Sequence, residues 1–282
     1  MNELNYFRSY LYVPASKPEI VAKAFNSDAD CVVIDLEDAV HVDSKTAARE
    51  FVAEFLKTKA PKPFLVRIND PNGAWGMLDL EAIASENLFG VRIPKISSIE
   101  TIKTAAKVFD AAKSNAQIHL LIESALGVQN AFELATADPR VKAISLGEAD
   151  LESDLRVTND EALKYSRNAI VVAARAAGLK QPSQSVFPNT KDIAGLTAST
   201  IAGKAAGFFG RSVIHPSQVA VVNEIFTPTA QEVEQALQLL SWYDQMQASG
   251  NSVMALPNGD LLDPANIHYA RFQVSLNQQL LN

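Results

Sequence analysis

The side chains of this sequence that are best suited to catalysis directly follow short apolar segments. They are Asp35, Glu37, Asp38, Arg67, Asn69, Lys95, Glu123, Glu148 and Asp150. Carboxylate oxygens are the ligands that Mg²⁺ prefers, and this ion commonly keeps several waters beside one or two carboxylates. The planar guanidinium of Arg67 offers a bidentate pair of hydrogen bonds to a carboxylate, which a lysine does not reproduce. A metal ion, a cation and an oxygen-rich substrate together predict stabilisation of an enolate or alkoxide.

Two of these carboxylates are the predicted metal ligands. Glu123 and Asp150 end neighbouring apolar segments and offer only hard oxygen donors. We therefore expect them to be the only protein side chains that bind Mg²⁺ directly, with Mn²⁺ as the substitute ion. The single cysteine, Cys31, and four scattered histidines exclude a cysteine-based zinc site and a local histidine pair.

Composition limits the class of protein. The chain has 282 residues, with 25 basic and 32 acidic side chains and a net charge of −7. Non-specific nucleic-acid binding needs clustered Lys and Arg, so this charge balance disfavours it. Hydrophobic residues make up 48%, as in a globular protein, and no apolar stretch approaches the roughly 20 residues of a membrane span. The first residues show no signal peptide, so we expect a cytoplasmic protein.

Short β-branched segments alternate with longer Ala-rich ones along most of the chain. Strands are predicted at residues 10–13, 31–35, 64–68, 90–93, 117–122, 141–146, 185–187 and 212–214. Helices, with apolar residues three and four apart, are predicted at 18–26, 44–57, 74–86, 99–113, 127–136, 161–178 and 192–206. Eight strand–helix units favour a (β/α)₈ TIM barrel, an α/β fold whose catalytic groups gather at the carboxyl ends of the strands. An open doubly wound sheet is the alternative, but no Gly-x-Gly-x-x-Gly motif follows the first strand.

The pattern changes after about residue 226. A helix is predicted at 230–248, with Thr229 as its N-cap and Glu232 three residues later. A long loop to residue 263 and a last helix from about 264 follow, and loops of this length are more often functional than idle. We expect residues 1–225 to form the catalytic barrel. Residues 226–282 should form a helix–loop–helix extension that packs on, or swaps onto, a neighbouring subunit.

Seven motifs, in order along the chain, point to one family. They are Arg8-Ser-Tyr-Leu-Tyr-Val-Pro, Asp35-Leu-Glu-Asp-Ala-Val, Arg67-Ile-Asn, Ile93-Pro-Lys, Leu121-Ile-Glu-Ser-Ala-Leu-Gly, Gly147-Glu-Ala-Asp-Leu and Val213-Ile-His-Pro-Ser-Gln. They resemble the citrate lyase β-subunit (CitE-like) family of the HpcH/HpaI aldolase and phosphoenolpyruvate/pyruvate-binding barrel superfamily. The resemblance runs from about residue 8 to 270 and includes Gly259-Asp-Leu-Leu-Asp-Pro near the end. Seven motifs in the same order along the chain are highly specific for the family, but they are much less specific for the substrate.

The resemblance implies a Mg²⁺-dependent carbon–carbon lyase. Such an enzyme cleaves a 3-hydroxyacyl thioester of malyl, citramalyl or citryl type, and it releases a 2-oxo acid and an acetyl-type thioester. CoA is then part of the substrate, and the binding partners are an acyl-CoA or a 2-oxo acid. The resemblance also implies a homo-oligomer, a trimer or a hexamer.

The resemblance assigns roles to single residues. Glu123 and Asp150 match the metal ligands, and Arg67 matches the residue that binds the carboxylate of the oxo acid and polarises its oxygen. Asp263 matches a catalytic acid or base that comes from a neighbouring subunit in related acyl-CoA lyases, although it could serve only as a helix N-cap before Pro264. The other matches are carboxylates around the metal water, Glu37 and Asp38, and positions that contact CoA, namely Tyr12, Lys23, Ser212 and Val213.

Three stretches depart from the family pattern. Ala15 stands where relatives have Gly after Val-Pro, and Ser124 stands where they have Thr. Residues 184–189, Gln-Ser-Val-Phe-Pro-Asn, stand where relatives tend to have Asp-Gly-Val-Tyr-x-Asp. Ala15 and residues 184–189 lie near strand ends, so the acyl pocket can differ while the metal and arginine positions are intact.

Other interpretations stay open beside the stand-alone lyase. One is the β-subunit of a citrate lyase complex, which acts on a thioester of an acyl-carrier protein and needs its partner subunits. Another is a catalytically silent homologue that still binds Mg²⁺ and a 2-oxo acid. An aldolase for free hydroxy-oxo acids is less favoured, because the C-terminal extension and Asp263 suit a thioester lyase better.

Overall fold

The computed structural model describes residues 6–264 and 267–281 of the chain. It divides into two compact units. The first covers Phe7–Asn223, and the second contains Tyr6 and the described residues from Glu224 onward. No helix in the described part of the chain is long and apolar enough to cross a membrane.

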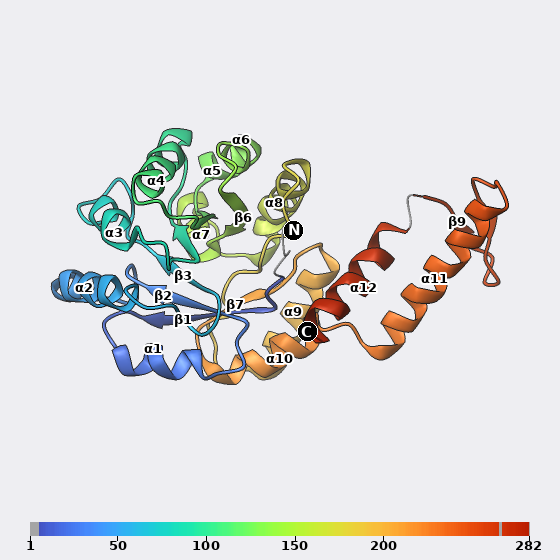
Figure 1. Ribbon diagram of the computed structural model, residues 1–282, viewed down its shortest axis with the longest axis horizontal. Coiled ribbons are helices and arrows are strands. Elements are labelled where there is room, and N and C mark those ends of the chain that lie inside the picture. Colours follow the sequence, from blue (N-terminus) through green and yellow to red (C-terminus); the bar gives the residue numbers. More distant parts are fainter. Residues whose placement is uncertain (1–5, 265–266, 282) are drawn as a thin grey trace. The chain divides into compact units, whose positions relative to one another are not determined.

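The first unit is built on a curled, parallel sheet of seven strands (Figure 1). The strands are β1 (Ser9–Pro14), β2 (Cys31–Asp35), β3 (Phe64–Arg67), β4 (Gly90–Ile93), β5 (Gln117–Ile122), β6 (Val141–Leu146) and β7 (Arg211–Val213), in the order β6-β5-β4-β3-β2-β1-β7. One row of register partners joins Pro14, Asp35, Arg67, Arg92 and His119 across five strands. This row places the ends of β2 and β3 side by side, and it sets the pairing on which the site depends.

The predicted strand at 185–187 does not form, and the eight-stranded closure is not seen in the described hydrogen bonds. A single bridge pairs Gln184 with Arg211 instead. There the Gln184 amide donates to the Gly210 carbonyl at 2.8 Å, and the Ser212 amide donates to the Gln184 carbonyl at 3.0 Å. Pro182 and Pro188 flank this stretch and lack the N–H that a ladder needs, which is the physical reason for the difference.

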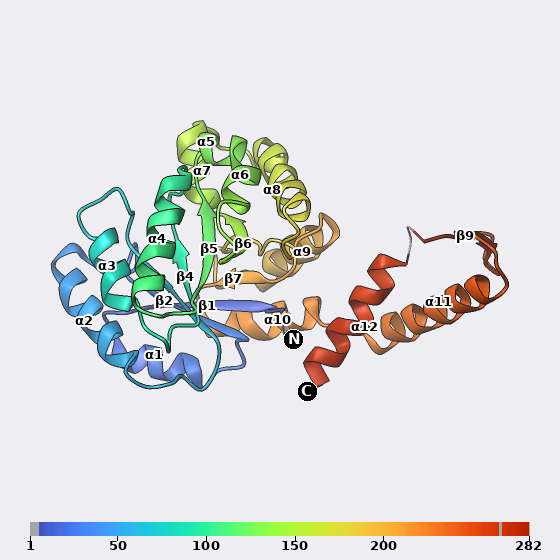
Figure 2. The ribbon, with the colours of Figure 1, turned by 45° about the horizontal axis from the view of Figure 1, so that its top comes forward.

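Helices lie around the outside of the strands (Figures 1 and 2). They are α1 (Pro18–Phe25), α2 (Lys45–Phe55), α3 (Gly76–Ile83), α4 (Ile99–Ala111), α5 (Ala125–Gln129), α6 (Ala131–Ala135), α7 (Glu148–Leu155), α8 (Lys164–Ala176), α9 (Ile193–Ala205) and α10 (Pro216–Phe226), with 3₁₀ turns at Val42–Ser44 and Asp160–Leu163. The predicted helix at 127–136 is two helices that meet at Asn130. The sequence pattern did not predict α7 and α10. β2 is buried along its whole length, as a strand covered on both faces should be.

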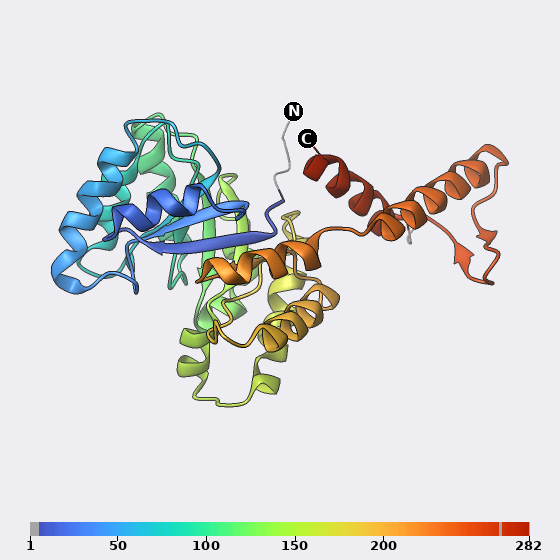
Figure 3. The ribbon, with the colours of Figure 1, turned by 90° about the horizontal axis from the view of Figure 1, so that it is seen from below.

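The second unit pairs two helices. These are α11 (Ala230–Ala248) and α12 (His268–Leu281), and Figure 3 shows a small hairpin of β8 (Met254–Ala255) and β9 (Leu261–Leu262) between them in sequence. The predicted capping box is present: the Glu232 amide donates to the Thr229 hydroxyl at 3.1 Å, and the Thr229 amide donates to the Glu232 carboxylate at 2.7 Å. The helix expected from about residue 264 begins at His268, and residues 265 and 266 lie outside the described residues.

Candidate functional site

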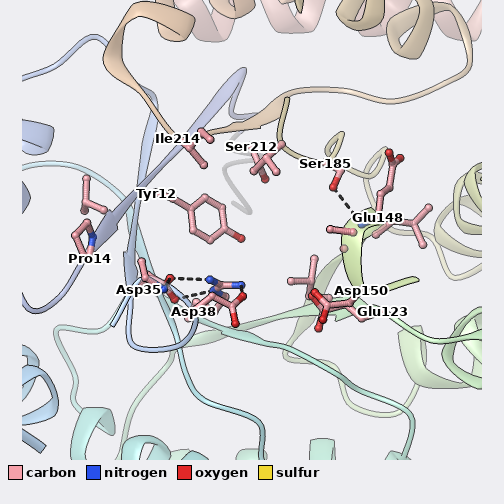
Figure 4. Close-up of a pocket in the computed structure, with 18 residues that line it drawn as sticks. Tyr12, Pro14, Asp35, Asp38, Glu123, Glu148, Asp150, Ser185, Ser212 and Ile214 are labelled. Carbon is pink, nitrogen blue, oxygen red and sulfur yellow. Dashed lines mark hydrogen bonds and ion pairs between the residues drawn. The ribbon is translucent and has the colours of Figure 1, made fainter. Parts of the chain in front are cut away.

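A cavity of about 420 Å³ lies at the carboxyl ends of the strands in the first unit. Asp35 ends β2 and Arg67 ends β3, while Glu123 follows β5 and Asp150 lies in the first turn of α7 after β6. Figure 4 shows Asp35 and Asp38 on one side of the cavity, and Glu123 and Asp150 on the other. Parallel strands direct their carboxyl ends to the same rim, so residues distant in sequence meet in one place.

Arg67 is held by carboxylates of its own chain. Its Nε and Nη2 donate to the two carboxylate oxygens of Asp35 at 2.7 and 2.6 Å, and its Nη1 donates to Asp38 at 2.9 Å. Nη1 also lies 2.9 Å from a carboxylate oxygen of Glu37. We expected the guanidinium fork to be offered to a substrate carboxylate, but Asp35 occupies it, because register pairing sets Asp35 directly beside Arg67. Arg67 therefore has single N–H groups left for a substrate oxygen.

Two guanidinium groups lie against the ring of Tyr12. The Cζ atoms of Arg67 and Arg92 are 5.2 and 5.6 Å from the ring centroid. Arg92 is 1% exposed, and its Nη1 donates to the Tyr12 oxygen at 2.7 Å and to the Ser212 hydroxyl at 3.3 Å. Because the phenol oxygen already accepts from a cation, the Tyr12 O–H is left to donate, and Tyr12 lines the cavity.

Glu123 is a buried carboxylate in a tight position. One of its oxygens accepts a hydrogen bond from the Lys95 amide at 2.7 Å, and Lys95 itself has a φ of 51°, in the left-handed region. A Cβ atom at Gly147 would overlap the Glu123 carboxylate, so glycine is required there for close approach. Burial, followed by the charge of Glu37, raises the pKa of Glu123 to about 8, and Asp150 adds to the shift.

Glu37 faces two cations from inside the rim. It lies 2.9 Å from Arg67 Nη1 and 3.2 Å from Lys95 Nζ, but neither of its buried oxygens has a hydrogen-bond partner in the described part of the chain. Burial raises the pKa of Glu37 to about 7, although Arg67 acts in the opposite direction. The site therefore gathers carboxylates whose charge the fold only partly offsets.

These features fit a divalent cation. Glu123 and Asp150 repel each other's charge, which a bound Mg²⁺ would relieve, and both supply the hard oxygen donors that this ion prefers. The orphaned oxygens of Glu37 suit a water bound to such an ion. Among residues 6–264 and 267–281, no group of three or more acidic, histidine or cysteine side chains forms a complete metal cage. Glu123 and Asp150 would thus leave most coordination positions of the ion to waters and substrate.

The structure brings together six of the predicted site residues in this cavity. They are Tyr12, Asp38, Arg67, Glu123, Asp150 and Ser212. Glu37 contacts Arg67 just beside it, whereas Val213 is buried in β7 and Lys23 is exposed on α1. Asp263 follows β9 in the second unit and is half-buried there.

Two residues that hold the site were missed at the sequence level. Asp35 was noted as a strand-end carboxylate, but its bidentate pairing with Arg67 was not predicted. Arg92 was not singled out at all. Its signal was a charged residue inside an apolar strand, Gly90–Ile93, where burial requires a partner.

Comparison with known proteins gives consistent matches. The model of the HpcH/HpaI aldolase/citrate lyase family matches residues 8–216. The citrate lyase subunit beta of Leuconostoc mesenteroides subsp. cremoris is 33% identical over 275 residues, which cover 93% of this chain and 90% of that protein. A (3S)-malyl-CoA thioesterase of Cereibacter sphaeroides is 34% identical over 270 residues, covering 94% and 92%. The crystal structure of protein CitE from Mycobacterium tuberculosis with magnesium, acetoacetate and coenzyme A has a TM-score of 0.79 at 28% identity, covering 96% of this chain and 97% of that one.

Proposed function

The chain belongs to the HpcH/HpaI aldolase/citrate lyase family, and we propose that it is a Mg²⁺-dependent lyase that cleaves a 3-hydroxyacyl-CoA thioester. A base removes the proton of the 3-hydroxyl group, the bond between carbons 2 and 3 breaks, and a 2-oxo acid forms. The electron pair of that bond remains on the second fragment as a thioester enolate. This enolate takes up one proton to become an acetyl-type thioester, so the atoms balance.

One observation carries this proposal: two carboxylates suited to a metal, Glu123 and Asp150, line one cavity together with the fixed guanidinium of Arg67. Figure 4 shows these two carboxylates across the cavity from Asp35, which holds Arg67. The CitE protein of known structure holds magnesium, acetoacetate and coenzyme A together, and magnesium and coenzyme A are ligands that the proposal requires. A structure of the citrate lyase beta subunit from the same organism holds oxaloacetate, a 2-oxo acid, with magnesium. Glu123 and Asp150 would hold the ion here. When bound, Mg²⁺ supplies a Lewis acid that stabilises negative charge on the oxygen of the oxo acid.

The chain's own residues do the remaining work. Arg67 is fixed by Asp35, so its remaining N–H groups are preorganised toward an oxygen in the cavity and need no reorganisation during the reaction. Tyr12 adds a hydroxyl donor whose direction Arg92 sets. Asp38 lines the cavity and has a 63% exposed side chain, which suits a group that holds a water or receives the hydroxyl proton.

The proton for the enolate is assigned to Asp263. This residue belongs to the unit that begins at Glu224, and the cavity belongs to Phe7–Asn223. We propose that Asp263 of one subunit serves the cavity of another in a homotrimer or hexamer. The same carboxylate would remove a proton from the acetyl methyl in the condensation direction.

Thioester hydrolysis is a second candidate function. It is favoured by the identity to the (3S)-malyl-CoA thioesterase, which extends over 94% of this chain. In this reaction water attacks the thioester carbonyl, and the products are a hydroxy acid and free CoA thiol. The two reactions are distinguished by their products, because only the lyase leaves the thioester bond intact.

The experiment is a screen of malyl-, citramalyl- and citryl-CoA with Mg²⁺, in which 2-oxo acid and free thiol are both measured. A lyase releases 2-oxo acid and an acyl-CoA in equal amounts, without free thiol. An acyl-carrier-protein thioester is the further arm, since turnover of that substrate alone would favour a citrate lyase subunit. Metal-dependent binding of a 2-oxo acid with no turnover of any thioester would reject an enzymatic function.

Glu123→Gln is the variant that tests the metal site. It removes a charge while keeping the shape of the side chain, so we expect weaker Mg²⁺ binding and loss of turnover. Glu133→Gln, at an exposed carboxylate of α6, is the matched control. Unchanged Mg²⁺ affinity in Glu123→Gln would show that the assignment of this ligand is wrong.

A further inference from the structure

A second cavity of about 570 Å³ lies between α8, α9 and the stretch around Gln184. It shares only Glu148 and Ser185 with the lining of the first cavity. Figure 4 shows Ser185 beside the backbone of Glu148, where the two cavities adjoin. This second cavity, which we call the seam cavity, lies where the sheet is not continued by a regular eighth strand.

The feature that distinguishes the seam cavity is Arg211. This residue is 4% exposed, yet no carboxylate of the described residues forms an ion pair with it. Its Nη1 donates to the hydroxyl groups of Ser199 and Thr200 at 3.1 and 3.0 Å, and its guanidinium lies 5.6 Å from the centre of the Phe187 ring. Its Nε is buried and has no hydrogen-bond partner within residues 6–264 and 267–281. Burial lowers the pKa of Arg211 to about 10, although the charge of Glu148 acts in the opposite direction. Nearby negative charge therefore offsets only part of the cost of burying this cation.

The other cations of the seam cavity are already paired. Arg167 donates to both oxygens of Glu148 at 2.8 Å and to Asp160 at 2.7 and 3.0 Å. Lys164 lies 2.6 Å from a carboxylate oxygen of Glu161. Arg167 with its two carboxylates carries a net charge of −1, so together with Arg211 the cavity comes to neutrality. A single negative charge could pair with Arg211, which has no ion pair of its own among the described residues, whereas a dianion would be repelled more strongly by Glu148 and Asp160.

The geometry of Arg211 suits a carboxylate. Nη1 is held by two hydroxyls and Nε is buried, so Nη2 is the group left to donate a charge-assisted hydrogen bond to a carboxylate. The guanidinium is fixed before any ligand arrives, which lowers the entropic cost of binding. The walls on either side are apolar: Phe187, Phe208, Ala202 and Ala206 line the same cavity. A second buried atom, Oε1 of Gln184, also has no partner in the described residues.

We propose that the seam cavity is a second ligand site, separate from the proposed active site, and that it binds a small monocarboxylate with a compact apolar body. The carboxylate of the ligand accepts a charge-assisted hydrogen bond from Nη2 of Arg211. Its apolar part lies against Phe187 and Phe208.

The test is calorimetric titration of the full-length protein with benzoate and butyrate, without Mg²⁺. Benzyl alcohol serves as the uncharged analogue, and inorganic phosphate as the more highly charged anion. We expect one benzoate per chain, weaker binding of benzyl alcohol, and no comparable binding of phosphate. Arg211→Gln should weaken benzoate binding by about ten- to a hundredfold, the scale of one hydrogen bond between charged groups.

Two further variants keep the test independent of the folding of Arg211→Gln. Ala202→Leu fills the seam cavity from an exposed position on α9 and should also abolish binding, whereas Ala198→Leu, on the same helix outside the lining, should not. The proposal is overturned if benzoate does not bind the wild-type protein, if Ala202→Leu binds it as well as Ala198→Leu does, or if phosphate binds more tightly than benzoate.

Discussion

Arg67 donates three of its five N–H groups to Asp35 and Asp38, so this guanidinium has a structural role beside the one proposed for it in the reaction. Although burial opposes its charge, the adjacent Asp35 raises the pKa of Arg67 above its usual value, and the side chain stays charged. Removing one member of a buried ion pair leaves the other uncompensated, which is the costly case. The site therefore depends on the geometry of the two hydrogen bonds from Arg67 to Asp35.

Arg67→Lys should lower turnover by roughly ten- to a thousandfold, the scale of losing a preorganised donor. An ammonium group keeps the charge but cannot span both oxygens of Asp35, so the donor directed at the substrate loses its orientation. Steady-state kinetics with the best thioester from the screen measures the effect. Arg140→Lys, at a surface ion pair with Asp110, is the control and should behave as the wild type. Near-wild-type turnover of Arg67→Lys would refute the assigned role.

His119 makes stability depend on pH. Burial, with a further contribution from Arg92, lowers the pKa of His119 to about 3, and its Nδ1 has no partner in the described residues. The folded protein therefore keeps this ring neutral, while the unfolded chain takes up a proton below a pH of about 6.5. This contribution to stability is complete above pH 6.5 and is lost as the pH falls toward 3.

Urea unfolding between pH 4.5 and 6.5 measures this linkage. In His119→Leu, the free energy of unfolding should depend less steeply on pH than in the wild type, by at most about 1.4 kcal/mol per pH unit, the value for one proton. Comparing the two proteins removes the contribution of the carboxylates, which titrate in both. His41→Gln, at an exposed histidine, should keep the wild-type slope. Equal slopes in His119→Leu and the wild type would contradict the prediction.

Among the elements, the turn from β6 into α7 has the most direct control of the site. Gly147 stands at this turn, and its lack of a Cβ lets the Glu123 carboxylate pack against the backbone. The turn also carries Asp150, so one short segment positions both proposed metal ligands. Helix α8 supports this turn, because its Arg167 donates hydrogen bonds to both carboxylate oxygens of Glu148.

Gly147→Ala should lower turnover about a hundredfold with little change in stability, because misplacing a reacting group by about 1 Å has that effect. The added methyl group would displace the end of a flexible side chain rather than backbone, so the fold can adjust. Turnover and thermal unfolding are measured together. If the substitution acts through Glu123, combining it with Glu123→Gln should add no further loss. Full additivity in the double variant would show another cause.

At the scale of the whole molecule, the proposed site draws on two compact units. The cavity belongs to Phe7–Asn223, and Asp263 belongs to the unit that begins at Glu224. A separate unit that delivers a catalytic group can also exclude water from an enolate that solvent would otherwise protonate. If the site is shared between subunits, two variants that are each inactive should recover activity when their subunits are assembled together.

Mixing of inactive variants is the test of a shared site. Asp263→Asn and Glu123→Gln should each be inactive as homo-oligomers, but dissociating and reassembling them together should restore part of the activity. Mixed interfaces place one intact Asp263 over one intact metal site. Wild-type protein carried through the same treatment is the control. If it recovers its activity while the mixed assembly stays inactive, the hypothesis of a shared site is rejected.

The sequence by itself was enough for the alternation of strands and helices, and seven of the eight predicted strands recur within two residues of their predicted ends, from β1 to β7. Local hydrophobic periodicity determines such elements, and the seven motifs indicated the family that the comparisons then showed. The motifs also named Arg67, Glu123 and Asp150, since strand-end residues are local in sequence. The predicted strand at 185–187 does not form, because prolines at 182 and 188 flank it.

What only the tertiary structure decided is which of these groups face one another. The pairing of Asp35 with Arg67 follows from the register between β2 and β3, which no local pattern specifies. The orientation of Arg92 toward Tyr12 depends on a contact between residues 80 positions apart. Packing likewise decides that Arg211 forms no ion pair with a carboxylate of the described residues. Long-range contacts of this kind arise from packing, so residue types and spacing cannot determine them.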